Sequence, residues 1–507
     1  MSQTAAIRPI DGLVDNHEFR MLIGGEMVGA TSGATFASVD PSTGQEIARV
    51  PDGGAEDIGR AVAAAQRAFP AWAALGVVGR SDIFARLAEA VRANSERLAM
   101  LDAVDGGMPY KAMLFDIEIS LQNIRDWPSL VRWHGGRTVP ATQGNLHYTS
   151  YQPYGVVGKI IPFNHPVMFA ITRILPALIA GNTVVLKAAQ QTPLSALVFG
   201  EITRDVLPPG VVNVVSGGAE PGDALVRNAS VKRISFTGSV STGMRVQERA
   251  AGSGIKAISL ELGGKNPMIV FPDVDLEDAV AGAISGMNFG VCSGQSCGSN
   301  SRVYVHRDLY EGFLSRAAED LSAMKVGRGY DETTQMGPLV SRQHYDRVMR
   351  FVQSGRDEGA RLVTGGSHPG GDIPRDGYYL QPTVFGDVAP TMDIARSEIF
   401  GPVLSVAPWT DYDDVVEQAN DSELGLTASV WTNDLSLAHK TAAKLEAGYV
   451  WINDSAKHFF GMPFGGMKSS GLGREESVEE YESYLELKAV HTILKEPAEA
   501  IKRLYRA

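Results

Sequence analysis

The spacing of apolar residues changes part of the way along the chain. Residues 55–73 predict a surface helix with one buried face, formed by Ile58, Val62, Ala65, Phe69 and Trp72. From about residue 151, short runs rich in β-branched residues alternate with helical patterns. Because crossover helices join the strands of a parallel sheet, this alternation predicts a doubly wound α/β fold.

The predicted strands form two series. The first comprises residues 156–161, 182–188, 211–217, 233–238 and 256–264, and the second comprises 268–271, 301–306, 403–409, 427–433 and 448–453. A chain of 507 residues is too long for a single hydrophobic core, so each series predicts a sheet-centred domain. Parallel sheets bind ligands beyond the carboxyl ends of their strands, where candidate site residues are therefore expected.

Several segments between these strands predict helices. The most apolar stretch, residues 166–181, predicts a buried helix, because Arg173 and two helix breakers interrupt it too often for a membrane span. The next helix is predicted to begin with Thr192 as its N-cap and Pro193 at its first position. A further helix is predicted from Asp275 to residue 290, directly before a loop that contains the cysteines.

Composition and charge narrow the possible functions. Apolar residues make up 44% of the chain and charged residues 21%, as in an ordinary globular protein. The net charge of −12 argues against a nucleic-acid or anionic-membrane partner. The first 20 residues contain no uninterrupted apolar run, so no signal peptide is expected. Because two cysteines cannot form a disulfide framework, we expect a cytoplasmic protein.

The two cysteines, Cys292 and Cys297, lie in the segment FGVCSGQSCGSN at residues 289–300. A lone cysteine is usually an inert buried residue. A metal site is disfavoured, because four residues separate the two thiols and no nearby histidine completes a usual ligand set. The Gly, Ser and Gln neighbours instead favour a reactive thiol, provided that the surroundings stabilise the thiolate.

Polar residues after the strands of the first series are further candidates. Glu261 precedes a Gly-Gly pair and is either a solvated loop residue or a general base in a cleft. Gly238 and Ser239 open a helix whose N–H groups suit a pyrophosphate, although the dinucleotide fingerprint G-x-G-x-x-G is absent. Asn164 lies between two prolines and is either a turn former or an amide donor for an oxyanion.

In combination, these segments resemble the NAD(P)-dependent aldehyde dehydrogenase superfamily. The resemblance spans about residues 20–495 and rests on PFNHP, GNTVVLKAAQQTPLSAL, LPPGVVNVVSG, FTGS, LELGGKNP, GQSC, EIFGPV and PFGGMKSSGLGRE, in family order. It implies two doubly wound parallel-sheet domains and a small β oligomerisation element. The implied boundaries are 1–134 and 154–262 for the NAD(P)-binding domain, 263–475 for the catalytic domain, and 135–153 and 476–507 for the oligomerisation element and C-terminal tail.

The resemblance assigns roles to individual residues. It makes Cys297 of GQSC the nucleophile, Glu261 of LELGG the general base and Asn164 of PFNHP the oxyanion donor. Glu475, at the end of GLGRE, matches a second carboxylate of a proton relay. The implied cofactor-binding residues are Ile160, Pro162, Phe163, Lys187, Gln190, Gly238, Ser239, Leu262, Glu398 and Phe400. No metal is implied.

The implied reaction is the oxidation of an aldehyde to a carboxylic acid with NAD. It proceeds through a thiohemiacetal and a thioester on Cys297, and Glu261 activates the water that hydrolyses the thioester. NADP is expected to be tolerated, because Gln190 replaces the glutamate that usually repels a 2′-phosphate. The alternatives are a CoA-acylating aldehyde dehydrogenase, whose members generally lack the general base, and a non-catalytic structural relative.

Other expectations concern the substrate and the assembly. The segment NDSAKHFFGMPF at 453–464 and His165 imply a pocket wall for a bulky or aromatic aldehyde, with His165 and His458 facing the substrate or pointing elsewhere. Residues 147–152 and a predicted late strand at 485–495 match the family's oligomerisation segments, so a homodimer or homotetramer is expected. Cys292 is either a small loop residue or a partner for a reversible disulfide with Cys297.

Overall fold

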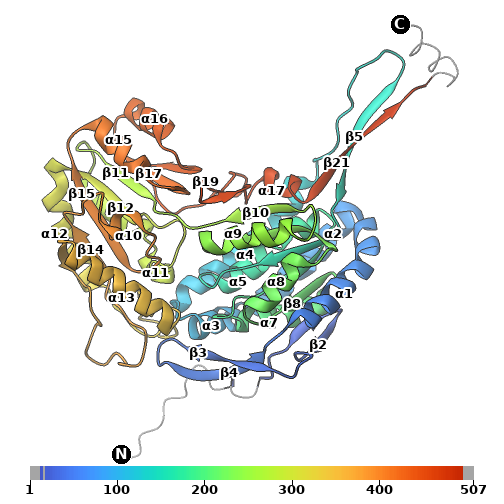
Figure 1. Cartoon of the computed structure of the whole chain (residues 1–507), viewed down its shortest axis with the longest axis horizontal. Helices are drawn as coiled ribbons and strands as arrows, with labels where there is room; N and C mark the ends of the chain where they lie inside the picture. Colours follow the sequence, from blue (N-terminus) through green and yellow to red (C-terminus); the bar gives the residue numbers. More distant parts are fainter. Residues whose placement is uncertain (1–11, 15–16, 495–507) are drawn as a thin grey trace, which may run out of the picture.

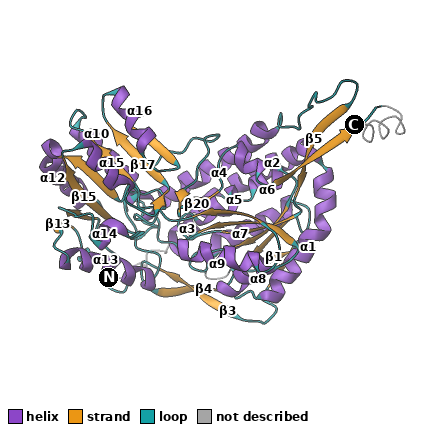
Figure 2. Cartoon of the chain, turned by 45° about the horizontal axis from the view of Figure 1, so that its top comes forward, coloured by secondary structure: helices purple, strands orange, loops and turns teal. Residues whose placement is uncertain are grey.

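The computed structural model describes residues 12–14 and 17–494, which build two sheet-centred parts and a projecting strand pair (Figure 1). The predicted fold class, with two doubly wound parallel sheets and a small β element, is confirmed. Residues 1–11, 15–16 and 495–507, including the far end of the expected C-terminal tail, lie outside the described part of the chain. Helices lie against both sheets (Figure 2).

The first sheet has eight strands among the described residues, in the order β2-β1-β8-β7-β6-β9-β10-β20. Their bounds are β1 Met21–Ile23, β2 Glu26–Val28, β6 Val156–Ile160, β7 Thr183–Lys187, β8 Val212–Val215, β9 Val231–Thr237, β10 Ala257–Glu261 and β20 Gly471–Leu472. The central strands β8, β7, β6, β9 and β10 are parallel. They are buried on both faces, which explains their nearly continuous β-branched sequences.

The second sheet has seven strands within residues 17–494, in the order β13-β14-β15-β12-β11-β17-β18. Their bounds are β11 Pro267–Val270, β12 Arg302–His306, β13 Arg361–Thr364, β14 Thr383–Gly386, β15 Val403–Trp409, β17 Thr427–Trp431 and β18 Tyr449–Ile452. All are parallel except β13 at the edge. Strand β20 follows this series in sequence, yet it pairs antiparallel with β10 and so joins the first sheet.

The helices around the first sheet are α1 Ala55–Ala74, α2 Gly76–Ala93, α3 Ser95–Asp105, α4 Tyr110–Val131, α5 Pro166–Thr172, α6 Leu175–Ile179, α7 Leu194–Val206, α8 Ala219–Arg227 and α9 Val240–Ala251. Those of the second part are α10 Leu276–Gly286, α11 Phe289–Cys292, α12 Arg307–Ala323, α13 Arg342–Asp357, α14 Asp393–Arg396, α15 Tyr412–Asn420 and α16 Leu435–Lys444. The short helix α17, Val478–Glu482, precedes the last strand. In α1 the predicted residues are buried except Phe69, which is partly exposed.

The structure corrects three predicted helix ends. The buried segment 166–181 forms two helices, because α5 ends at Thr172 and α6 begins at Leu175. Thr192 does not cap α7, whose first N–H donates to Oδ2 of Asp105 at 3.0 Å.

The helix predicted from Asp275 to residue 290 is also shorter than expected. Asp275 does cap α10, since its side chain accepts from the N–H groups of Glu277 and Asp278. The helix ends at Gly286, and Asn288 then adopts a left-handed φ of 56°. The separate helix α11 follows and ends at Cys292, so this cysteine is helical rather than part of the predicted loop.

Three strand pairs within the described residues lie outside the two sheets. They are β3 Thr35–Asp40 with β4 Gln45–Pro51, β16 Leu424–Gly425 with β19 Met467–Lys468, and β5 Leu146–Pro153 with β21 Leu485–Thr492. The β5–β21 pair projects away from the rest of the chain (Figure 1).

No single helix among the described residues has the length and apolar character of a membrane span. Only α1 and α2 taken together meet that test, and they are bent by 112° where they join.

Candidate active site

The carboxyl edge of the first sheet gathers most of the predicted site residues. Asn164 follows β6, Lys187 ends β7, Ser239 follows β9 and Glu261 ends β10. Because these strands are parallel neighbours, their last residues lie along one edge. The N–H of Gly238 donates to the carbonyl of Glu261 at 3.0 Å, which joins the ends of β9 and β10 directly.

The second part of the chain brings Cys297 to this edge. Its side chain is half-buried, and its thiol lies beside the carboxyl group of Glu261. The side chain also packs against a small buried cluster made by Leu426, Tyr449, Trp451 and Phe464. The structure therefore places the predicted nucleophile and the predicted general base in contact.

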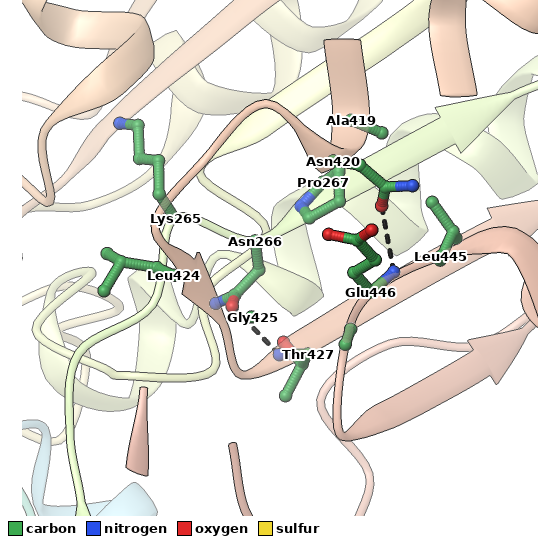
Figure 3. A pocket seen from close by; sticks show the side chains of 11 residues that line it. Lys265, Asn266, Pro267, Ala419, Asn420, Leu424, Gly425, Thr427, Leu445 and Glu446 are labelled. Carbon is green, nitrogen blue, oxygen red and sulfur yellow. Dashed lines mark hydrogen bonds between the residues drawn. The ribbon is translucent and has the colours of Figure 1, made fainter. Parts of the chain in front are cut away.

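Asn266, which sequence reasoning missed, fixes the backbone around Cys297. Its Nδ2 donates to the carbonyl oxygens of Cys297 at 2.7 Å and Ser299 at 2.9 Å. Its Oδ1 accepts from the N–H of Thr427 at 3.0 Å, the bond drawn in Figure 3 at the edge of a small surface pocket. The sequence feature that could have identified Asn266 is its place in LELGGKNP, two residues after the Gly-Gly pair. The structure shows that its side chain is buried.

Burial sets the protonation states of Glu261 and Cys297. Burial and then the neighbouring Glu475 raise the pKa of Glu261 to about 8, although the hydrogen bond from Cys297 and the charge of Arg173 oppose this rise. Burial, followed by the charge of Glu261, holds the pKa of the Cys297 thiol well above its usual range. Near neutral pH both groups therefore carry their protons, and higher pH favours their reactive, ionised forms.

Asn164 is buried and has an unsatisfied oxygen. It follows β6 in the turn that leads into α5, and its Oδ1 has no hydrogen-bond partner among the described residues. A buried amide oxygen without a partner is costly in a folded protein. The unsatisfied atom is an acceptor, so a ligand bound here could donate to Oδ1, whereas the predicted oxyanion contact would use the Nδ2 donor of the same amide.

An ion pair lies beside Glu261. Arg173 Nη1 and Glu475 Oε2 are 2.8 Å apart, and both side chains are buried. Glu475 is held in place because its backbone pairs with that of Phe464 in both directions, at 2.7 and 3.0 Å. Arg173 is recognisable in the sequence as a single cation inside the apolar stretch 166–181. Its charge lowers the pKa of both Glu261 and Cys297.

The predicted dinucleotide residues form a cradle around the starts of α8 and α9. Ser239 is the N-cap of α9 and accepts from the N–H of Thr242 at 3.3 Å. Burial lowers the pKa of Lys187 to about 8, and Asp52 opposes this shift. Gln190 is exposed and lies beside Gly218, where an added Cβ would be 3.6 Å from its Oε1.

The remaining members of the cradle are apolar. Ile160 ends β6, and Pro162 and Phe163 follow it in the same turn as Asn164. Leu262 packs so closely on α9 that a Cβ added at Gly243 would lie 2.7 Å from its Cδ2.

Glu398 and Phe400 meet the cradle from the second part of the chain. Glu398 Oε1 accepts from the N–H of Gly264 at 3.0 Å, and a Cβ added at Gly263 would lie 2.2 Å from Glu398 Oε2. Burial raises the pKa of Glu398 to about 7. The ring of Phe400 lies edge-on to that of Phe163, with centroids 5.7 Å apart. The structure therefore brings the predicted residues of both sheets to one junction.

The two histidines of the expected pocket wall are already paired with carboxylates. His165 Nδ1 lies 2.7 Å from Asp116 Oδ2, and His458 Nδ1 lies 3.0 Å from Glu476 Oε2. His165 is also hydrogen-bonded to Cys292. Cys292 is fully buried, and both cysteines are free thiols.

Comparisons with known proteins identify the family of the chain. A model of the aldehyde dehydrogenase family matches residues 28–490. The hydroxyisobutyraldehyde dehydrogenase of Mycolicibacterium austroafricanum is 42% identical over 473 residues, which cover 93% of each chain. The mitochondrial benzaldehyde dehydrogenase of Antirrhinum majus is 40% identical over 495 residues, covering 97% of this chain and 92% of that one.

Solved structures of aldehyde dehydrogenases also match the chain. The NAD+ complex of an aldehyde dehydrogenase from Bacillus cereus matches with a TM-score of 0.93 at 39% identity, covering 97% of this chain and 99% of that chain. Likeness of this degree extends over nearly the whole chain and therefore over both sheets. The chain belongs to the aldehyde dehydrogenase family of oxidoreductases.

Proposed function

We propose that the chain oxidises an aldehyde to its carboxylic acid with NAD+, through a thiohemiacetal and then a thioester on Cys297. The observation that carries this proposal is the contact between the Cys297 thiol and the Glu261 carboxyl group. A nucleophile within hydrogen-bond reach of a base is the arrangement that covalent catalysis requires.

The proposed reaction has two half-reactions, which are the attack of Cys297 on the aldehyde and the hydrolysis of the thioester. The Cys297 thiol loses its proton to solvent, and the resulting Sγ thiolate attacks the aldehyde carbon. The amide of Asn164 and the backbone N–H of Cys297 stabilise the oxyanion, and loss of one such donor typically costs about 3 kcal/mol of barrier. In the second half-reaction Glu261 takes a proton from water, which hydrolyses the thioester.

The residues of the cradle fit a nicotinamide dinucleotide. Lys187 and the start of α9 at Ser239 would hold the ribose and pyrophosphate, and Glu398 and Phe400 would hold the nicotinamide half. The absence of a side chain at Gly263 leaves room that Glu398 fills, so the carboxylate is fixed at the junction. When bound, NAD+ supplies the hydride acceptor. The neutral Gln190 supports tolerance of NADP as well.

A bulky or aromatic aldehyde is the proposed substrate class. Aromatic rings gather beside Cys297, where Tyr449 and Phe464 have centroids 5.6 Å apart and Phe464 lies 4.4 Å from His458. Nearby in sequence, Phe460 lies edge-on to Trp127 at 5.1 Å. Such rings offer faces and edges to an aromatic substrate. The relative named benzaldehyde dehydrogenase supports the same class.

A homo-oligomer is proposed from the β5–β21 pair. Its strands project from the chain and expose apolar side chains such as Leu146 and Leu487. Exposed edges of this kind invite pairing with another copy.

One kinetic experiment tests the proposed reaction. NADH formation at 340 nm is followed after mixing enzyme, NAD+ and benzaldehyde, with and without CoA. The wild type is expected to turn over without CoA, Cys297→Ala to produce no NADH, and Glu261→Gln to give one rapid equivalent per site followed by slow turnover. Unchanged NADH formation by Cys297→Ala would overturn the proposal, and a strict requirement for CoA would replace hydrolysis with acyl transfer to CoA.

A further inference from the structure

A single helix holds the loop that contains Glu398 and Phe400. His344 and Arg347 lie one turn apart on α13, and together they bind three successive backbone carbonyls. Arg347 donates to the carbonyls of Glu398 at 2.6 Å and Ile399 at 2.9 Å. His344 Nε2 donates to the carbonyl of Phe400 at 2.7 Å. The position of this loop therefore depends on α13 rather than on its own turn geometry.

The hydrogen bond from His344 acts on a residue with unfavourable backbone geometry. Phe400 has a φ of 58°, in the left-handed region that bulky side chains seldom adopt. A conformation of this kind is strained for a bulky residue and persists only where the surroundings hold it. The bond to the carbonyl of Phe400 itself is such a restraint.

The His344 ring also joins the two sheet-centred parts. It lies edge-on to Phe400 at a centroid distance of 6.0 Å, and to Phe163 at 5.8 Å. Phe163 and Phe400 contact each other at 5.7 Å, so the three rings form a closed triangle. Phe163 belongs to the turn that also contains Asn164, whereas Phe400 belongs to the second part of the chain.

The imidazole is suited to this position because it is neutral. Burial lowers the pKa of His344 to about 4, against the opposing hydrogen bond to Phe400 and with a smaller contribution from the charge of Arg347. A neutral ring packs between two phenyl rings without placing an uncompensated charge in the interior. Its remaining N–H is the donor that Phe400 accepts.

We propose that His344 is a positioning residue for hydride transfer, because it fixes Phe400 and Phe163 as one rigid platform where the nicotinamide half of the cofactor binds. This proposal rests on the proposed function, since the platform has this role only in a nicotinamide-dependent oxidation. His344 touches neither the reacting carbon nor Cys297 in this account, and it acts through Phe400.

Three variants at position 344 test the ring and the hydrogen-bond donor of His344 separately. His344→Leu removes both the ring and the donor, His344→Gln keeps a donor, and His344→Phe keeps a ring. A matched control is His368→Leu, because His368 Nε2 also lies 3.2 Å from a backbone carbonyl, that of Pro374. The His368 ring also lies edge-on to an aromatic ring, that of Tyr379 at 6.2 Å.

The first readout needs neither substrate nor cofactor. Hydrogen–deuterium exchange of the peptide spanning 396–404 is measured in the free protein. We expect exchange in His344→Leu to be at least about tenfold faster than in wild type, with His344→Gln intermediate and His368→Leu unchanged. Unchanged exchange in His344→Leu would overturn the proposal, whether or not the enzyme oxidises aldehydes.

The second readout concerns the reaction itself. In His344→Leu we expect NADH affinity to fall about tenfold and kcat to fall up to about 100-fold, because small misplacements slow oriented reactions strongly. The isotope effect with a 1-deuterated aldehyde should rise, and His344→Gln should recover most of the loss. If affinity, kcat and isotope effect stay within about twofold of wild type, the positioning role is wrong.

If His344→Leu does not fold, the comparison of His344→Gln with His344→Phe decides: greater activity with the donor supports the proposal, and equal activity contradicts it. A wild type that makes no NADH from any aldehyde would instead overturn the proposed function.

Discussion

Cys292 and Cys297 lie five positions apart, yet their surroundings are those of two different regions. Cys292 ends α11, is fully buried in the core that surrounds the first sheet, and is hydrogen-bonded to His165. Cys297 is half-buried, packs against the small cluster of the second part and contacts Glu261. Gln295 lies between them and bonds the carbonyl of Cys292 through its own N–H and side-chain Nε2, at 2.9 and 3.0 Å.

This difference separates a packing role from a chemical role within one short segment. The Cys292 region is a buried contact between the two parts, in which the Asp116 carboxylate holds an imidazole against the thiol side chain. The Cys297 region contains a thiol, a carboxyl group and a nearby cation, and its titrating groups are perturbed. Perturbed titrating groups that converge in this way are typical of catalytic sites.

The largest expected contrast is in activity. Cys297→Ala should lower kcat/KM for an aldehyde by on the order of 10⁴-fold or more, because the covalent route is lost. Cys292→Ala should keep kcat/KM within about tenfold of wild type and lower the free energy of unfolding by about 1–3 kcal/mol through the cavity it leaves. Initial rates and urea unfolding of both variants check this pair. Equal losses of activity in the two variants would remove the distinction.

The second contrast concerns the base beside Cys297. Glu261 must be ionised to accept a proton, and its pKa is raised to about 8, so kcat should increase with pH up to a plateau above about 8. Glu261→Gln should lower the plateau about 10²- to 10⁴-fold and remove the rise near pH 8, because the amide does not titrate, and any rise left at higher pH belongs to the Cys297 thiol. A pH profile of wild type and variant between pH 6 and 10 is the measurement. A wild-type profile that is flat across this range would contradict the assigned base.

The third contrast concerns the positive charge of Arg173, which is paired with Glu475 beside Glu261. Arg173→Met leaves Glu475 buried without its partner, which should lower the free energy of unfolding by about 3–5 kcal/mol. It should also raise the pKa of Glu261 and shift the kcat profile toward higher pH, since Arg173 lowers that pKa. Arg173→Lys is the matched control that keeps the charge, and it should show smaller changes in both. A stable Arg173→Met with an unshifted profile would show that the pair is dispensable.

The smallest contrast lies on the Cys292 side. The carboxylate of Asp116 raises the pKa of His165 well above its usual range, against the opposing effect of burial. The folded chain therefore binds a proton there that the unfolded chain has lost above about pH 6.5, so this stabilisation falls as pH rises through the folded pKa. Asp116→Asn should cost about 1.5–3 kcal/mol at pH 6 and progressively less at higher pH. Urea unfolding of both proteins between pH 6 and 9 measures the difference, and a cost that does not change with pH would contradict the pairing.

The sequence predicts the features that depend on neighbouring residues. The alternation of strands and helices fixed the two sheets, and short motifs located Cys297, Glu261 and Asn164 at their strand ends or loop. These patterns are local, because buried parallel strands need continuous apolar runs and turns need particular residues.

Features formed by distant segments could not be predicted in this way. Asp105 caps α7 in place of Thr192, and β20 crosses back to pair with β10. The partner of Arg173 is Glu475, which lies almost at the other end of the chain. Each of these contacts joins segments that are far apart in the sequence, and spacing along the chain does not indicate which distant segments meet.

The central claim is that Cys297 alone carries the acyl group. Glu261→Gln is mixed with NAD+ and benzaldehyde, quenched in acid within the first turnover, digested and analysed by mass spectrometry. We expect a benzoyl mass increment on Cys297 in an amount equal to the NADH released, and unmodified Cys292. NADH release with the increment on Cys292, or with no acylated cysteine, would contradict it.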